Sequence, residues 1–162
     1  MDYGALDKED FDAVVTGELT HLAIWLEDEL NGIVTDYFVG DANRRGEFRR
    51  FLLLRDGLTA QDKLEVVRAM LPLFKLSEAE LVDWKKILKG IEEFKRWRNA
   101  MAHGLDVTPD PYQKELVIEI VTRSGAGRQI KVTPAAHETL LRDTTALLER
   151  VRKARASLVG KV

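Results

Sequence analysis

The chain of 162 residues carries 25 Lys and Arg against 27 Asp and Glu, a formal net charge of −2, with 45% hydrophobic and 32% charged residues. This length fits a single domain over residues 1–162 with a buried core, and the composition is that of a soluble globular protein. The charge argues against a strongly basic nucleic-acid binder, the lack of cysteine excludes disulfides and thiolate metal sites, and no uncharged apolar run reaches the roughly 18 residues of a membrane span.

The amino terminus bears on the localisation of the protein, and the histidines bear on metal binding. The first residues are acidic and lack the apolar segment of a secretory signal, which favours a cytoplasmic protein. His21, His103 and His137 lie far apart, and none has the spacing of a metal-binding pair. His21 and His137 also lack partners that would give them a function. We therefore expect neither a metal site nor a cofactor.

Charge is distributed unevenly along the chain. Residues 1–36 contain ten acidic residues and one lysine, a net charge of −9, whereas the remaining residues hold 24 basic and 17 acidic groups, a net charge of +7. A polyanion responds to the local field and not to the total charge, so the positive part can attract phosphate. A solvated acidic helix face explains the N-terminal charges equally well.

Apolar residues at three- and four-residue steps predict a long amphipathic helix over about residues 9–38. The turn-forming residues of 40–46 predict a loop, and the apolar residues that follow predict a short helix ending at Asp56-Gly57. The densest basic cluster of the chain lies here and consists of Arg44, Arg45, Arg49, Arg50 and Arg55. For this cluster we slightly favour ion pairs with the acidic first helix over contacts with phosphate.

Capping residues predict the start of the next two helices. Thr59 caps a third helix whose apolar pattern stops at Pro72, and Ser77-Glu78-Ala79-Glu80 has the form of a capping box that opens a longer fourth helix. On the helical wheel of this fourth helix, Arg98 lies about 40° from Phe94, inside the apolar stripe. A guanidinium at a core-facing position is costly unless it is paired, so Arg98 requires a partner or a function.

After the fourth helix the pattern changes. Residues 116–121 and 129–132 predict two strands joined by a glycine-containing turn at 124–127, and Thr133-Pro134 opens a final helix to about residue 158. An isolated hairpin is only marginally stable, so it must pack on the helices. The predicted fold is therefore mainly α, a helical bundle of about five helices with a β-hairpin inserted between the fourth helix and the C-terminal helix.

The candidate chemistry lies in the segment Arg98-Asn99-Ala100-Met101-Ala102-His103-Gly104. Asn99 and His103 are four residues apart and share a helix face with Lys95, whereas Arg98 is roughly 140° from His103 around the axis. Imidazoles ordinarily titrate near pH 6.5 and transfer protons at neutral pH, and a guanidinium stays charged and matches phosphate oxygens. Gly104 predicts that the helix ends just after His103.

The string Arg98-Asn99-x-x-x-His103 near the end of a long helix resembles the Arg-x(4–6)-His signature of the HEPN superfamily, the higher eukaryotes and prokaryotes nucleotide-binding domains. The fuller form Arg-Asn-x-x-Ala-His-Gly is seen in many prokaryotic members. The predicted order of motif helix, hairpin and closing helix is similar to small HEPN-like proteins, so the resemblance covers most of the chain. One departure is Leu105, which stands where HEPN toxins silenced by a nucleotidyltransferase carry a tyrosine.

This resemblance implies a metal-independent endoribonuclease of the kind found in toxin–antitoxin and anti-phage defence systems. It implies catalysis by Arg98 and His103 with help from Asn99, and RNA binding by Lys95 and Arg96. In such proteins the site forms where the motif helices of two protomers meet, so a homodimer with a composite active site is expected. RNA is the expected substrate, and an antitoxin or other regulatory protein is a possible partner.

Two other interpretations remain open. HEPN-like domains also occur as noncatalytic helical modules that bind nucleotide, RNA or protein, and the near-neutral charge favours such a module. Alternatively, His103 is an ordinary residue at a helix C-terminus, and Arg98 pairs with Glu93, Glu119 or an acid of the first helix. The tryptophans are predicted to be core or interface residues and not platforms for bases: Trp25, Trp84 and Trp97.

Overall fold

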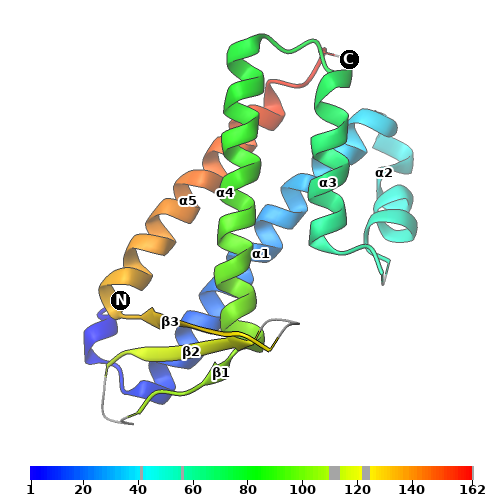
Figure 1. Cartoon of the computed structure of the whole chain (residues 1–162). Coiled ribbons are helices and arrows are strands. Elements are labelled where there is room, and N and C mark those ends of the chain that lie inside the picture. Colours follow the sequence, from blue (N-terminus) through cyan, green and yellow to red (C-terminus); the bar gives the residue numbers. More distant parts are fainter. Residues whose placement is uncertain (41, 56, 110–113, 122–124, 162) are drawn as a thin grey trace. The chain divides into compact units, whose positions relative to one another are not determined.

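The computed structural model describes residues 1–40, 42–55, 57–109, 114–121 and 125–161. The described chain is mainly helical, with a small antiparallel sheet that lies between α4 and α5 in sequence, which confirms the predicted fold class (Figure 1). In chain order the elements are a 3-10 turn (Tyr3–Ala5), α1 (Lys8–Phe38), α2 (Ala42–Phe48), a π-helical turn (Arg49–Leu53), α3 (Ala60–Met70), a 3-10 turn (Leu71–Leu73), α4 (Glu78–His103), β1 (Leu105–Asp106), β2 (Leu116–Val121), β3 (Gly127–Val132) and α5 (Pro134–Ala156).

The chain divides into two compact units. The first comprises Met1–Ala23 and Glu92–Ala146, and the second comprises Ile24–Ile91 and Leu147–Val162. α1, α4 and α5 each contribute residues to both units. A single domain over residues 1–162 stays a prediction.

Helix starts in both units follow the predicted capping residues. The Thr59 hydroxyl accepts from the backbone N–H of Asp62 while the Asp62 carboxylate accepts from the backbone of Thr59, a complete capping box. Ser77 and Glu80 make the same reciprocal contacts at the start of α4. At the start of α5, the backbone N–H of Ala136 donates to the Thr133 hydroxyl at 3.2 Å. Each cap satisfies amides that have no partner within the helix, so these boundaries are readable from sequence.

A three-stranded antiparallel sheet forms in the first unit, in the order β1-β2-β3. The hairpin β2–β3 was predicted, whereas the two-residue strand β1 was not. Side chains alternate between the two faces of a strand, so one face carries the partners Leu116↔Val132, Ile118↔Ile130 and Ile120↔Arg128. The inner end of this face joins the core of the first unit, whose fully or nearly fully buried residues include Phe11, Val15, Leu19, Phe94, Leu116, Ile118 and Val132.

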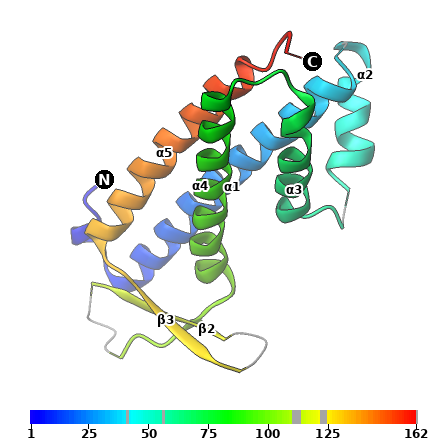
Figure 2. The same cartoon turned by 45° about the horizontal axis from the view of Figure 1, so that its top comes forward.

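The second unit contains α2, α3, the N-terminal half of α4 up to Ile91, and the C-terminal segment. Its buried residues include Leu30, Ile33, Leu64, Val67, Trp84, Ile87, Leu88 and Val151. The C-terminal segment reaches the connection between α3 and α4 (Figure 2), where the backbone N–H of Lys75 donates to the carbonyl of Lys161 at 2.7 Å. Lys161 also pairs with Glu80, and its hydrogen bond, together with those from Ser77, lowers the pKa of the Glu80 carboxyl to about 2.

The region after α1 differs from the prediction. Residues 40–46 were expected to form a loop, but α2 begins at Ala42, and Asp41 lies outside the described residues. Among the described residues of this segment, Gly40 carries the predicted break, with a left-handed φ of +61° after the end of α1. Ion pairs then stabilise the helical segment against α1, because Arg45 pairs with Asp36 and Arg49 pairs with Asp28. For these two arginines the intramolecular interpretation of the basic cluster is confirmed.

Glycine is required at position 104 because neighbouring atoms lie close to it, and not because its backbone is left-handed. Its φ does not lie in the left-handed region, but a Cβ on it would lie 2.5 Å from the Ala100 carbonyl oxygen and closer still to the Ile118 side chain. We expect Gly104→Ala to lower the free energy of unfolding by about 1–3 kcal/mol, because the end of α4 and β2 must separate. In contrast, Gly17→Ala should raise it by about 0.5–1 kcal/mol, since Gly17 lies within α1 with open space at its Cβ.

Urea denaturation of the two variants and the wild type measures both effects. The pair is matched because the chemical change is the same and both glycines lie in the first unit. A Gly104→Ala protein as stable as Gly17→Ala would contradict the close approach of β2 to the end of α4.

Candidate functional site at the end of α4

The motif segment forms the last turns of α4. The helix ends at His103, and the backbone N–H of Gly104 donates to the carbonyl of Ala100 at 2.7 Å as its final hydrogen bond. This confirms the predicted end of the helix. Gly104 lies close to Ile118 of β2, and β1 begins at the next residue, Leu105. His103 is therefore held at a fixed end of α4 while its side chain stays exposed.

Arg98 lies half-buried between the core and the exposed face. Its Nη1–H donates to Asn99 Oδ1 at 3.2 Å, while its Nε is buried without a hydrogen-bond partner. Among the described residues Arg98 forms no ion pair, so the alternative in which it pairs with Glu93, Glu119 or an acid of the first helix is not seen there. A buried donor without a partner costs about 1–3 kcal/mol. This cost is a physical reason to expect that the guanidinium has a ligand.

The other predicted site residues differ in exposure and in direction around the axis of α4. Asn99 and His103 are exposed one turn apart, and Lys95 is half-buried one turn before Asn99. No hydrogen bond joins Arg98 and His103 in the described part of the chain. Arg96 is exposed, lies about 100° around the helix axis from Lys95, and lines a groove against the sheet. The structure thus brings Arg98 to Asn99 and places Asn99 beside His103, but it separates the two predicted RNA-binding residues.

The groove beside Arg96 has a volume of about 180 Å³ and lies within the first unit. Helix α4 contributes Glu93, Arg96, Trp97 and Ala100, and the sheet contributes Ile120, Arg128 and Ile130. Trp97 is half-buried there, whereas Trp84 is a core residue and Trp25 is half exposed. Arg128 was not predicted as a site residue, because nothing in the sequence connects it to Arg96 across 32 positions.

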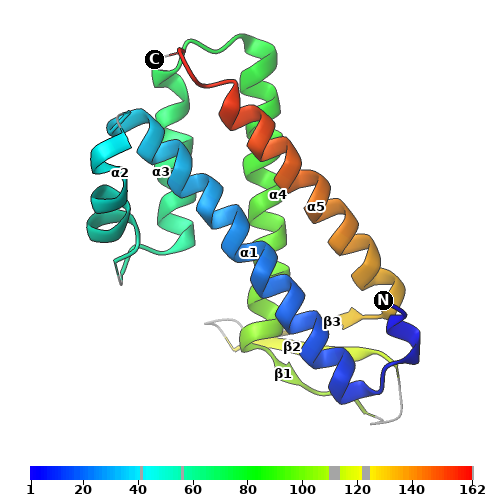
Figure 3. The same ribbon diagram turned by 180° about the vertical axis from the view of Figure 1, so that it is seen from behind.

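A buried polar cluster in the first unit was also missed. His137 is fully buried, and its Nε2–H donates to Glu18 Oε2 at 2.7 Å. The Tyr3 hydroxyl donates to both oxygens of the same carboxylate at 3.1 Å, and the N-terminal turn lies beside the first turn of α5 (Figure 3). The prediction that His137 lacks partners is therefore wrong. One signal was available, since His137 lies seven residues before Thr144 and shares its buried helix face.

Further features limit the chemistry that the described residues offer. No group of three or more His, Cys, Asp or Glu side chains within residues 1–40, 42–55, 57–109, 114–121 and 125–161 is placed to hold a metal ion. In the same ranges, no helix combines the length and apolarity that crossing a membrane requires. The chain matches no protein-family model, no curated protein and no solved structure.

Proposed function

We propose that this protein is a metal-independent endoribonuclease of the HEPN type, with its site at the end of α4. One observation carries the proposal: Asn99 and His103 are exposed on one face of the last two turns, and the Arg98 guanidinium is hydrogen-bonded to Asn99. This bond directs the cation toward the face that holds the imidazole. A phosphate bound at this face meets both a proton-transfer group and a charged donor.

The proposed reaction is attack by the RNA 2′-oxygen on the adjacent phosphorus. The bond from phosphorus to the 5′-oxygen breaks, which leaves a 2′,3′-cyclic phosphate and a 5′-hydroxyl. His103 transfers a proton at the 2′- or 5′-oxygen, and Arg98 stabilises the charge of the phosphorane. Asn99 holds the guanidinium through the observed hydrogen bond, and Lys95 lies one turn further back to contact the RNA backbone.

A second copy of the chain completes this site in our proposal. Arg98 and His103 are separated by five residues, about 7.5 Å along the helix axis and roughly 140° around it. Two-fold pairing of α4 helices brings the Arg98 of one protomer to the His103 of the other. The homodimer is therefore part of the mechanism.

The biological setting proposed for this activity is that of a toxin or an anti-phage defence component. An enzyme that cleaves cellular RNA inhibits growth unless a regulatory protein restrains it. Expression of the wild type should therefore slow bacterial growth, and expression of His103→Ala should not. Equal growth of both strains at equal protein levels would contradict the toxin role without bearing on cleavage in vitro.

The direct test is cleavage of single-stranded RNA in the presence of EDTA. We expect products that end in 2′,3′-cyclic phosphate, identified by mass spectrometry, and no such products from His103→Ala purified in the same way. A folded dimer that leaves every RNA intact would overturn the proposal. Binding of RNA or protein that His103→Ala does not alter would then assign the chain to the noncatalytic modules.

A further inference from the structure

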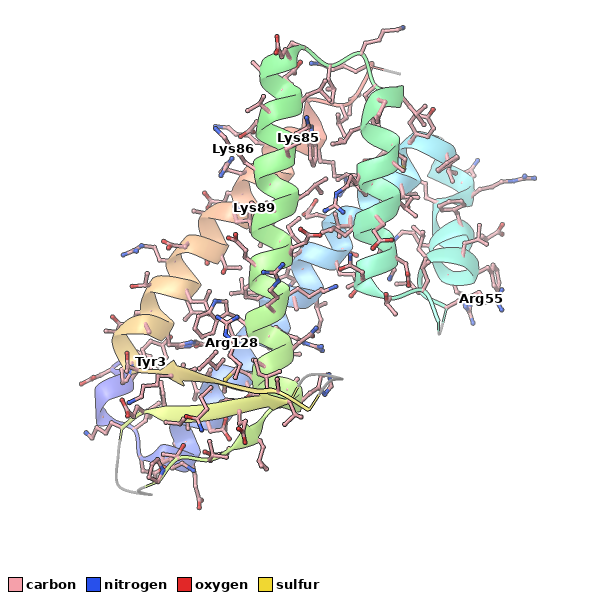
Figure 4. The ribbon with its side chains drawn as sticks, in the orientation of Figure 1. Tyr3, Arg55, Lys85, Lys86, Lys89 and Arg128 are labelled. Carbon is pink, nitrogen blue, oxygen red and sulfur yellow. The ribbon has the colours of Figure 1, made fainter. Side chains whose placement is uncertain are left out.

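The groove between α4 and the sheet has an unusual arginine in its wall. Along β3, alternate side chains share a face, so Arg128 lies on the same face as Ile130 and the buried Val132. Figure 4 shows Arg128 beside α4, and its strand partner Ile120 also lines the groove. Apolar residues continue this face inward, yet its outer position holds a cation. Within the described residues the Arg128 side chain has no hydrogen bond or ion pair.

The opposite wall adds a second cation and an aromatic ring. Arg96 of α4 likewise forms no ion pair in the part of the chain that the structure describes, and Trp97 follows it in sequence. One acidic residue, Glu93, lines the same groove, which leaves a local net charge of +1. Two guanidinium groups match phosphate oxygens, and an indole ring stacks with a planar base. The lining therefore combines the two contacts that a nucleotide makes.

We propose that this groove binds one unstacked nucleotide of single-stranded RNA, with its base against Trp97 and its phosphate between Arg96 and Arg128. The choice of RNA rests on the proposed function of the α4 motif. The volume of about 180 Å³ is below the range of about 300–1,000 Å³ that holds drug-sized ligands, so it suits a single base. A duplex does not fit this description, because its bases are stacked and paired.

The helix geometry relates this nucleotide to the proposed cleavage site. Arg96 precedes His103 by seven residues, which is about 10.5 Å along the axis and only about 20° around it. The groove and the imidazole therefore lie on the same side of α4. One short single strand can therefore contact both the groove and the imidazole. The groove is thus a subsite for substrate beside the reacting phosphate.

Fluorescence anisotropy with a labelled single-stranded RNA tests the inference. The full chain carries His103→Ala in every sample so that the RNA stays intact. Added to this background, Trp97→Leu should weaken binding about 5- to 150-fold, the loss of one base stack. Arg128→Gln should weaken binding and reduce the slope of log affinity against log salt by about 0.7, the loss of one phosphate contact. A duplex of the same sequence should bind the Trp97→Leu and Arg128→Gln variants equally.

Arg142→Gln is the matched control, since Arg142 is an exposed arginine of the first unit that lies outside the groove. Arg96→Gln provides a second groove variant, and circular dichroism checks that each protein is folded. Affinity and salt slope of Arg96→Gln and Arg128→Gln equal to those of Arg142→Gln would overturn the subsite. The absence of any RNA binding would overturn it as well.

The same samples separate this inference from the proposed catalysis. If RNA binds through the groove but the chain with His103 restored leaves it intact, the subsite is supported and the nuclease is refuted. If RNA is cleaved and neither its binding nor its cleavage depends on Trp97 or Arg128, the nuclease is supported and the subsite is refuted.

Discussion

Substitution of His103 by alanine is expected to slow RNA cleavage about 10²- to 10⁴-fold, the usual contribution of a general acid or base. Arg98→Ala should slow it about 10²- to 10³-fold, the effect of removing one charged donor from a developing oxyanion. Because the two groups act on the same transition state, the double variant should lose little more than the slower single variant. Single-turnover cleavage of a labelled RNA in EDTA measures all three rates.

Two matched substitutions control for changes unrelated to the site. His21→Ala removes an exposed imidazole from α1, and Arg142→Ala removes an exposed guanidinium from α5. Both should cleave at the wild-type rate. Arg98→Lys tests the fork geometry, since a lysine keeps the charge but cannot reproduce the paired donors of the guanidinium. A fully active Arg98→Ala would contradict the role of Arg98, and circular dichroism must first show that this half-buried site tolerates the change.

Mixing the two inactive variants tests whether the site is shared between protomers. A mixed dimer of Arg98→Ala and His103→Ala holds one site with both native residues if Arg98 and His103 come from different chains. Random exchange makes roughly half of the dimers mixed, so we expect about a quarter of the wild-type rate. No recovery after verified subunit exchange would show that each protomer supplies its own pair.

Local signals were sufficient to predict most of the fold. Thr59, Ser77 and Thr133 mark helix starts because their hydroxyls satisfy backbone amides that no other local group reaches. The same reasoning failed after Gly40, where turn-forming residues stand inside α2. There the helix depends on ion pairs of Arg45 and Arg49 with α1, and pairings at such distances leave no periodicity in the sequence.

The candidate site was predictable only in its helical part. Asn99 and His103 share a face because of helix geometry alone, and the structure places both in solvent as expected. The approach of Arg128 to Arg96 depends on packing between α4 and the sheet, and the hydrogen bond from Arg98 to Asn99 depends on a side-chain rotamer. The spacing of residues along the sequence does not predict such packing. Tertiary contacts also decided the environment of His137, whose partner Glu18 lies 119 positions away.

Substitution of His137 by alanine should have the largest effect on stability. The imidazole is fully buried, meets the Tyr3 ring edge to face at 4.9 Å and the Phe11 ring at 6.1 Å, and donates to Glu18. Its loss leaves a cavity and removes one of the two donors to the Glu18 carboxylate, so the free energy of unfolding should fall by about 3–5 kcal/mol. His21→Ala should change it by less than about 0.5 kcal/mol, since His21 is exposed.

Glu18→Gln separates packing of the ring from its hydrogen bond. The glutamine has almost the same size and still accepts a hydrogen bond, and the Glu18 side chain is 35% exposed, so water compensates part of the change. We expect a loss of about 0.5–1.5 kcal/mol in urea denaturation. A loss as large as that of His137→Ala would instead assign most of the stabilisation to the carboxylate.

The pH dependence of the same cluster provides an independent test through Tyr3, whose side chain is labelled in Figure 4. Burial, followed by the hydrogen bond to Glu18 and the charges of Glu18 and Glu138, raises the pKa of Tyr3 from 10.0 to about 12. A raised pKa means that the fold favours the neutral phenol. This stabilisation is complete below pH 10 and is lost as the pH rises from 10 to about 12.

Ultraviolet titration should therefore show one tyrosine that ionises well above the usual range, and Tyr3→Phe should remove that transition. In Glu18→Gln the Tyr3 pKa should fall, because the charge and the acceptor carboxylate are both gone, but burial should still hold it above 10.0. If Tyr3 ionised at its usual pH in the folded wild type, the phenol would be open to water. The His137 ring against it would then be open as well, and the large loss expected for His137→Ala would not follow.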